Sequence, residues 1–342
     1  MFRNIITGLF LSIVSITGCS GLTAVQNTPP NESLHHDTLV SEDIQTDNSD
    51  SPAIEGDGAV LDTFEAPEAE VVVDDPMDVQ PPEPPKVIDP EGMTLETRFP
   101  APIGYHRIAG KDSGYADYLR KLPLLADGSP VMLFNGELKE YQNGHVAVVD
   151  IDVGDRDLQQ CADAAMRLRT EYLFHSNQHE KMVYHLTNRQ ELSWPKWKTG
   201  YRLKYLGNNK TEYKKVAGAG SSYETYRNWL YYLMMYGGVN SIMKFDATAI
   251  ELEEIEPGDV FASTGHLIII IDVVANDDGD KKFLLAQSYM PAQQIEILKN
   301  PYDASTPWYS LEMVREVYAA GNPFTTPEWQ FPPPGPNVYR MR

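Results

Sequence analysis

Residues 256–291 read EPGDVFASTGHLIIIIDVVANDDGDKKFLLAQSYMP and contain the clearest strand of the chain. A turn of the Ser-Thr-Gly type precedes His266, and the apolar, largely β-branched run 267–271 follows it. An unbroken run of this composition is typical of a strand that is buried on both faces. The pattern therefore predicts a histidine at the mouth of a central strand.

The segment after this strand predicts its neighbour. An Asp-Gly turn at 278–279 is a strong hairpin signal, and the apolar run 283–286 fits the returning strand. Gln287 and Ser288 follow that run. A hairpin of this length brings a polar pair close to His266, so either Gln287 or Ser288 is expected to orient the imidazole or to bond to nearby backbone.

A helix is predicted from Asp155 onward. Asp155 is a suitable N-cap residue, and the apolar residues from Leu158 to Tyr172 recur every three or four positions. Cys161 would then lie near the sixth helical position, on the apolar stripe. The small residues around Ala162 predict that this helix packs closely against a sheet.

The remaining elements alternate between helix and strand. A second helix is expected over residues 222–236, capped by Ser221 and ended by Gly237-Gly238. Strands are expected at 130–134, 144–152, 183–186 and 201–203, and loops at 207–222 and 301–336. This order predicts an α+β fold: one domain over residues 94–342 with a central, mostly antiparallel sheet and packed helices.

The first 93 residues differ in character from the rest. Residues 1–18 resemble a signal peptide, and Ile16-Thr17-Gly18-Cys19 resembles a lipobox, which predicts acylation of Cys19. Residues 20–91 carry 18 acidic residues and one lysine and are rich in proline. Such a segment cannot bury enough apolar surface to fold, so residues 19–93 are expected to form a disordered acidic tether.

The charge distribution and the leader predict the surroundings of the protein. The net charge of the chain is −21, and no basic patch favours a nucleic-acid partner. The expected partners are the membrane, through the lipid on Cys19, and peptidoglycan or another envelope component. Ser20 after the acylated cysteine gives no retention signal of the Asp type, which favours the outer membrane of a bacterial envelope.

Several motifs resemble the bacterial lipoprotein family called domain of unknown function 4846. They are LPL at 122–124, GSPV at 128–131, HVAVVD at 145–150, VGDRDLQQCAD at 153–163, GDVF at 258–261 and LLAQSYMPAQ at 284–293. The resemblance covers residues 98–330 and implies family membership without an assigned activity. A weaker resemblance is to papain-like cell-wall cysteine hydrolases, whose order of motifs falls here on Cys161, Gly258-Asp259, His266 and Gln287.

The candidate site residues allow two interpretations. Cys161 is either a nucleophile or a small buried residue, and His266 is either its base or a structural histidine at a strand entrance. Gln287 is the candidate orienting residue, and His145 and Ser288 are candidate binding residues. A helix that starts at Asp155 disfavours catalysis, because catalytic cysteines are activated at helix N-termini.

Three functions remain open at this stage. The first is an amide hydrolase of the envelope. The second is a lipoprotein that binds a glycan, peptide or protein partner. The third is an assembly factor that the tether separates from the membrane. The spacing of cysteines, histidines and carboxylates predicts no metal site, and no glycine-rich loop predicts a nucleotide, so no cofactor is expected.

Overall fold

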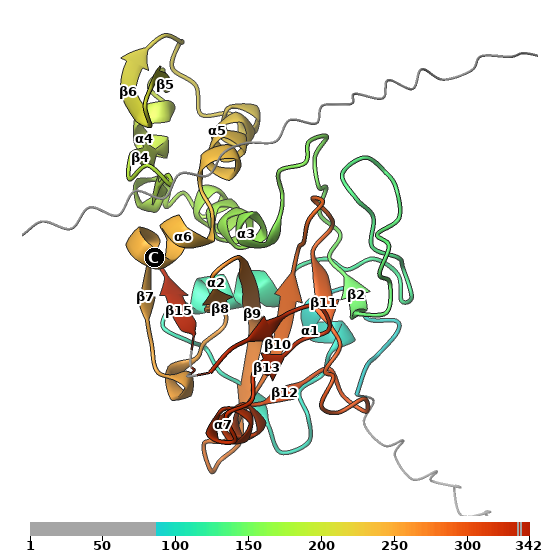
Figure 1. Cartoon of the computed structure of the whole chain (residues 1–342). Coiled ribbons are helices and arrows are strands. Elements are labelled where there is room, and N and C mark those ends of the chain that lie inside the picture. Colours follow the sequence, from blue (N-terminus) through green and yellow to red (C-terminus); the bar gives the residue numbers. More distant parts are fainter. Residues whose placement is uncertain (1–86, 334, 336) are drawn as a thin grey trace, which may run out of the picture. The chain divides into compact units, whose positions relative to one another are not determined.

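The computed structural model describes residues 87–333, 335 and 337–342 (Figure 1). The predicted signal peptide, Cys19 and residues 19–86 of the predicted tether lie outside the described residues. The described part has the expected α+β architecture, with one large antiparallel sheet and helices against it. None of its helices is both long and apolar enough to cross a membrane.

The main sheet has nine strands, and all of its pairings are antiparallel. Along the sheet the order is β2 (His145–Val148), β11 (Glu296–Leu298), β10 (Lys281–Gln287), β9 (His266–Ala275), β8 (Val260–Ser263), β15 (Val338–Met341) and β7 (Ala247–Ala249). Two short strands, β1 (His106–Arg107) and β12 (Tyr309–Ser310), pair with β9 and β10.

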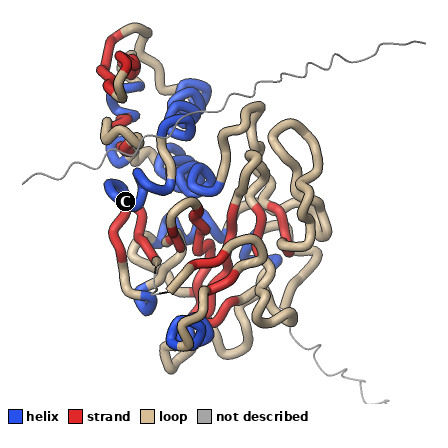
Figure 2. Tube along the Cα trace, in the orientation of Figure 1, coloured by secondary structure: helices blue, strands red, loops and turns tan. Residues whose placement is uncertain are grey.

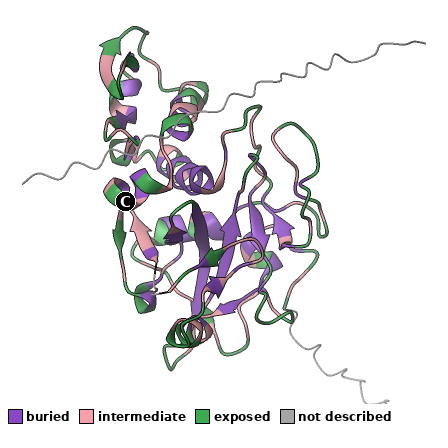
Figure 3. Ribbon diagram, in the orientation of Figure 1, coloured by how far each residue is buried: buried purple, intermediate pink, exposed green. Residues whose placement is uncertain are grey.

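Strand β9 is buried on both faces, as its sequence predicts. Leu267, Ile269 and Ile271 contribute to one hydrophobic core, and Ile268 and Ile270 contribute to the other. This alternation follows from the two-residue period of a strand. Figure 3 shows β9 and β10 as the most continuously buried part of the sheet.

The helices of the described part are α1 (Leu95–Arg98), α2 (Ser113–Arg120), α3 (Cys161–His175), α4 (Trp194–Trp197), α5 (Tyr223–Tyr236), α6 (Val239–Ser241) and α7 (Leu311–Ala319), with short 3₁₀ or π turns at His179–Lys181, Ile242–Asp246 and Leu252–Glu254. Some helices cover the two faces of the sheet, and α4 and α5 lie beyond α3, away from it (Figure 2). Helices α2 and α3 pack against β9, and α7 packs against β10. The buried face of α7 belongs to the second core, so α3 and α7 lie on opposite faces.

Helix α3 begins at Cys161, and the predicted start at Asp155 is wrong. Gln160 is the N-cap residue, and the segment before it is irregular. The Asp157 carboxylate accepts a hydrogen bond from the backbone N–H of Ala292 at 2.7 Å. Because Asp157 is held by a distant segment, it does not continue a helix. The structure therefore places Cys161 at the first helical position, as a catalytic cysteine requires.

Two predicted loops contain regular structure. Residues 207–222 include β6 (Lys210–Lys215), which pairs with β5 (Tyr201–Gly207). Asn208 and Asn209 form its turn with φ of 50° and 57°, a conformation that asparagine tolerates well. The predicted loop 301–336 contains α7, capped by the Ser310 hydroxyl, and the hairpin of β13 (Phe324–Thr325) and β14 (Gln330–Phe331).

Three other predicted elements are shorter than expected, and one of them is the strand predicted at 144–152, which is limited to His145–Val148. Residues 183–193 form the small hairpin of β3 (Val183–His185) and β4 (Glu191–Ser193). The segment predicted as a strand at 130–134 makes only isolated bridges, from Met132 to Leu138 and from Leu133 to Gln293. It therefore lies beside the sheet without becoming one of its strands.

The end of the predicted tether contacts the folded part. The backbone N–H of Asp89 donates to the carbonyl of Arg98 at 2.8 Å, and Arg98 Nε donates to the carbonyl of Gly92 at 2.8 Å. Arg98 is fully buried. A Cβ on Gly92 would lie 2.4 Å from the backbone of residues 97 and 98, so this approach requires glycine.

Candidate active site

Cys161 is the first residue of α3, where the helix meets β9. Burial raises the pKa of its thiol, and three backbone N–H groups, those of Leu267, of Ala162 and of Cys161 itself, oppose that rise. The N–H groups in the first turn of a helix have no partners within the helix and stabilise negative charge. Cys161 is partly exposed, so it is not sealed in the core. The prediction that the Cys161 helix packs beside the His266 strand is confirmed.

His266 is the first residue of β9, and Gln287 is the last residue of β10. Because the two strands are antiparallel neighbours, these residues lie at the same edge of the sheet. The His266 Nε2 atom is 3.0 Å from Gln287 Oε1. Both side chains are buried, with His266 only 2% exposed.

The hydrogen bonds of Gln287 determine which imidazole nitrogen carries the proton. Gln287 Nε2 donates to Glu296 Oε1 at 2.9 Å and to Glu328 Oε2 at 2.7 Å. The other end of the amide, Oε1, can only accept, so His266 donates through Nε2–H. In the neutral imidazole this leaves the lone pair on Nδ1, the nitrogen that would receive a proton.

Two aromatic rings flank His266. Its ring centroid is 5.0 Å from that of Tyr289 and 4.8 Å from that of Trp329. Trp329 is fixed by a hydrogen bond from its Nε1 to Ser263 Oγ at 3.1 Å, at the end of β8. These rings limit the access of water to the imidazole and hold it in place.

Burial shifts the pKa of both Cys161 and His266 toward the neutral form. Burial lowers the pKa of His266 to about 4, against a weaker opposing effect of the Gln287 hydrogen bond. Burial also raises the pKa of Cys161, and the N–H of Leu267 opposes that effect. At neutral pH Cys161 is therefore a thiol and His266 an uncharged imidazole.

A buried carboxyl group lies in the first turn of α3. Asp163 Oδ2 accepts a hydrogen bond from the backbone N–H of Gln160 at 3.1 Å. Burial raises the pKa of Asp163 to about 8. Ionised Asp163 also raises the pKa of Cys161 through its negative charge.

Sequence reasoning missed a charged cluster behind Gln287. Lys139 Nζ donates to Glu296 Oε1 and to Glu328 Oε2, each at 2.6 Å. Lys139 and Glu296 are buried, and Glu328 lies in the turn between β13 and β14. No local signal indicates this cluster, because its members are 157 and 189 positions apart from Lys139 in the chain.

The two candidate binding residues lie around the same site. His145 Nε2 is 3.1 Å from the carbonyl of Ser129, and its Nδ1 is 3.9 Å from Glu296 Oε2. The fully buried Ser288 hydroxyl lies 2.7 Å and 2.8 Å from the carbonyls of Gln159 and Gln293. Ser288 therefore ties β10 to the segment before Cys161, which gives it a structural role.

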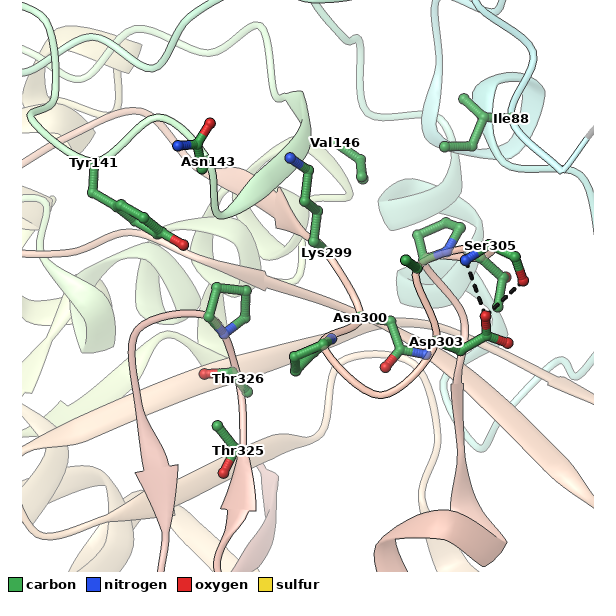
Figure 4. A pocket seen from close by; sticks show the side chains of 15 residues that line it. Ile88, Tyr141, Asn143, Val146, Lys299, Asn300, Asp303, Ser305, Thr325 and Thr326 are labelled. Carbon is green, nitrogen blue, oxygen red and sulfur yellow. Dashed lines mark hydrogen bonds between the residues drawn. The ribbon is translucent and has the colours of Figure 1, made fainter.

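A cavity of about 640 Å³ lies beside this region, and neither Cys161 nor His266 lines it. Its walls are residues 141, 143, 146, 299–301, 303–307 and 325–327, together with Ile88. Figure 4 shows Tyr141 and Asn143 at one end of the cavity and Asp303 and Ser305 at the other. Within residues 87–333, 335 and 337–342 no group of three histidine, cysteine or acidic side chains is placed to hold a metal ion.

Comparison with known proteins gives one match. The model of a family described as "Domain of unknown function (4846)" matches residues 95–334. No curated protein and no solved structure matches the chain.

Proposed function

The chain belongs to this domain family of unknown function (4846), and from its site we propose that it is a cysteine hydrolase of amide bonds in peptides. The observation that carries the proposal is the position of Cys161. It heads α3, which packs against β9, and its pKa is lowered by the backbone N–H of Leu267, the residue next to His266. The order Cys161, His266, Gln287 also resembles that of papain-like cell-wall hydrolases.

In the proposed reaction His266 acts first as a base and then as an acid. Its Nδ1 accepts the thiol proton of Cys161, and the sulfur attacks the amide carbonyl carbon. The oxyanion that forms is stabilised by backbone N–H groups at the start of α3. His266 then returns the proton to the departing amine, which leaves an acyl thioester on Cys161.

Water completes the cycle. His266 takes a proton from a water molecule, and the resulting hydroxide attacks the thioester carbonyl. The thiolate leaves and recovers its proton from His266, so one amide and one water yield one carboxylic acid and one amine. Gln287 keeps the imidazole oriented throughout, as the third member of a catalytic triad does.

Peptidoglycan peptides are the proposed substrate class. The lipobox at Cys19 and the acidic tether motivate this choice, because together they would hold the domain in the envelope near the cell wall. The peptides of that wall supply amide bonds in quantity, and the reaction needs only water as co-substrate.

A second candidate function is binding without turnover. The cavity of about 640 Å³ favours it, because Cys161, His266 and Gln287 do not line the cavity. The ring of Tyr141, the amide of Asn143 and nearby hydroxyl groups suit a peptide or a glycan. In that case His266 would be a structural or ligand-contacting residue of an envelope lipoprotein.

The test is release of amino groups from purified peptidoglycan by the mature protein. We expect release by the wild type, and loss of it in Cys161→Ala and His266→Ala. His106→Ala is the matched control, because His106 is an exposed histidine on β1 and should leave the activity unchanged. Binding of peptidoglycan by a wild type that releases no amine would overturn the hydrolase in favour of the binding function.

A further inference from the structure

The amide of Gln287 is held between an imidazole and two carboxylates. Its Oε1 faces His266, and its Nε2 lies 2.9 Å from Glu296 Oε1 and 2.7 Å from Glu328 Oε2. Glu296 is fully buried, and the Glu328 side chain is 11% exposed. Hydrogen bonds to charged acceptors in such a low-dielectric site are strong.

This arrangement blocks rotation of the amide by half a turn. A flipped amide would put the oxygen of Gln287 against the oxygens of Glu296 and Glu328, with no proton between them. Repulsion between an amide oxygen and buried carboxylates is costly, because the carboxylates would also lose a donor each. The two carboxylates therefore fix which end of the amide faces His266.

Lys139 allows the two carboxylates to share the site. Two like charges this close repel one another and would favour protonation of one of them. The Lys139 ammonium lies 2.6 Å from an oxygen of each and offsets part of that repulsion, while burial and Glu296 still raise the pKa of Glu328. Lys139 is itself held in place, because its backbone N–H donates to the carbonyl of Val131 at 3.0 Å.

We propose that Lys139, Glu296 and Glu328 are positioning residues that fix the Nε2–H tautomer of His266 by locking the Gln287 amide. Only this tautomer presents a lone pair on Nδ1. The catalytic importance of the tautomer rests on the proposed hydrolase function, whereas the fixed orientation of the Gln287 amide does not. Without the carboxylates the amide can turn, its Nε2 donates to His266 Nε2, and the imidazole proton moves to Nδ1.

Two variants remove the carboxylates that hold the Gln287 amide without leaving an unpaired buried charge. Glu328→Gln keeps the size of the side chain and leaves Lys139 paired with Glu296. The triple variant K139M/E296Q/E328Q removes all three charges, which avoids the penalty of an unpaired buried ion. The control is Asp246→Asn, which alters a different buried carboxylate, one bonded to His185 at 2.7 Å and remote in the chain from Gln287.

The readout is the ¹⁵N spectrum of the imidazoles at pH 7 in the mature protein labelled at histidine, with His266 assigned from the spectrum of His266→Asn. We expect only Nε2–H in the wild type and in the Asp246→Asn control. The share of Nδ1–H should rise in Glu328→Gln and rise further in the triple variant. Thermal melting identifies any variant that does not fold, and Glu328→Gln, at a partly exposed turn, keeps the test decisive if the triple variant fails.

Two results would overturn the proposal. One is an Nδ1–H tautomer in the wild type, and the other is an unchanged Nε2–H tautomer in every variant that folds. Amine release from peptidoglycan is measured in parallel, where we expect kcat to fall by about tenfold or more with little change in KM. Absence of amine release by the wild type would contradict the proposed hydrolase function. The tautomer result would still decide whether Lys139, Glu296 and Glu328 fix the orientation of the Gln287 amide.

Discussion

The backbone N–H of Leu267 lowers the pKa of the Cys161 thiol, across the contact between α3 and β9. Leu267 follows His266 directly in the chain. The contact between α3 and β9 therefore fixes the helix that carries the thiol relative to the strand that carries the imidazole. The long run of buried apolar residues in β9 keeps that strand from shifting. The relative position of Cys161 and His266 therefore depends on core packing and not on a mobile loop.

His266 should make the fold less stable in acid. Its pKa is about 4 in the folded protein and 6.5 as an ordinary histidine, so between these values the unfolded chain binds the extra proton. The stability from the buried neutral imidazole is complete above pH 6.5 and is lost as the pH falls toward 4. The loss should amount to about 3 kcal/mol of unfolding free energy.

Urea unfolding of the wild type and of His266→Asn at several pH values tests this expectation. The wild type should lose more unfolding free energy than His266→Asn between pH 6.5 and 4. The exposed-residue control His106→Asn should follow the wild type. Parallel curves for the wild type and His266→Asn would contradict the assigned pKa of His266.

The position at which the chain is truncated should matter for stability. A chain that starts at Val87 should melt at the same temperature as the mature protein, since it keeps the bonds of Asp89 and Gly92 to Arg98. A chain that starts at Thr94 leaves the buried Arg98 guanidinium without the Gly92 carbonyl. We expect its melting temperature to be lower by roughly 3–10 °C, in proportion to one lost charged hydrogen bond.

Calorimetry of the three chains checks this prediction. Equal melting temperatures for the chains that start at 87 and 94 would show that residues 87–93 add nothing to stability. A lower melting temperature for the chain that starts at Val87 would instead show that residues before it contribute to folding.

Local patterns in the sequence predicted the elements whose pattern is strong. The run 267–271 predicted β9, and the Asp-Gly turn with the run 283–286 predicted β10, because strand composition and turn chemistry are local properties. They placed Gln287 or Ser288 near His266, and the structure shows that it is Gln287. The start of α3 was predicted wrongly for a physical reason. Asp155 has the residue type of an N-cap, but the bond from Ala292 to Asp157 holds the preceding segment in another conformation.

The charged cluster behind Gln287 could not be predicted from the sequence. Lys139, Glu296 and Glu328 come from three segments without any shared motif, and only the tertiary fold brings them within hydrogen-bonding distance. The environment of Cys161 was likewise hidden. Leu267 is an apolar residue, and it lowers the pKa of Cys161 through its backbone N–H. Every residue except proline has such a group, so the sequence does not indicate this effect.

Cys19 should carry the membrane anchor. The lipobox predicts that residues 1–18 are removed and that labelled palmitate is incorporated at Cys19. Cys19→Ala should abolish labelling and release the protein from the membrane fraction. Cys161→Ala is the matched control, because it removes the other cysteine and should leave both properties intact. Full membrane retention of Cys19→Ala would argue against a lipid anchor at this residue.

The reactivity of Cys161 should depend strongly on pH and on Asp163. Burial raises the pKa of the thiol, so alkylation by iodoacetamide should be slow at pH 7 and should increase as the pH rises. The pKa of Asp163 is about 8, and above that pH its negative charge opposes formation of the thiolate.

Asp163→Asn retains an oxygen that can accept the N–H of Gln160 but removes the charge. Its alkylation profile should therefore shift to lower pH than that of the wild type, and the difference in rate should be largest above pH 8. Both proteins are compared by mass spectrometry of the Cys161 peptide, with Cys161→Ser as the blank. Identical profiles would show that Asp163 does not influence the thiol, and fast alkylation of the wild type at pH 6 would contradict the raised pKa of Cys161.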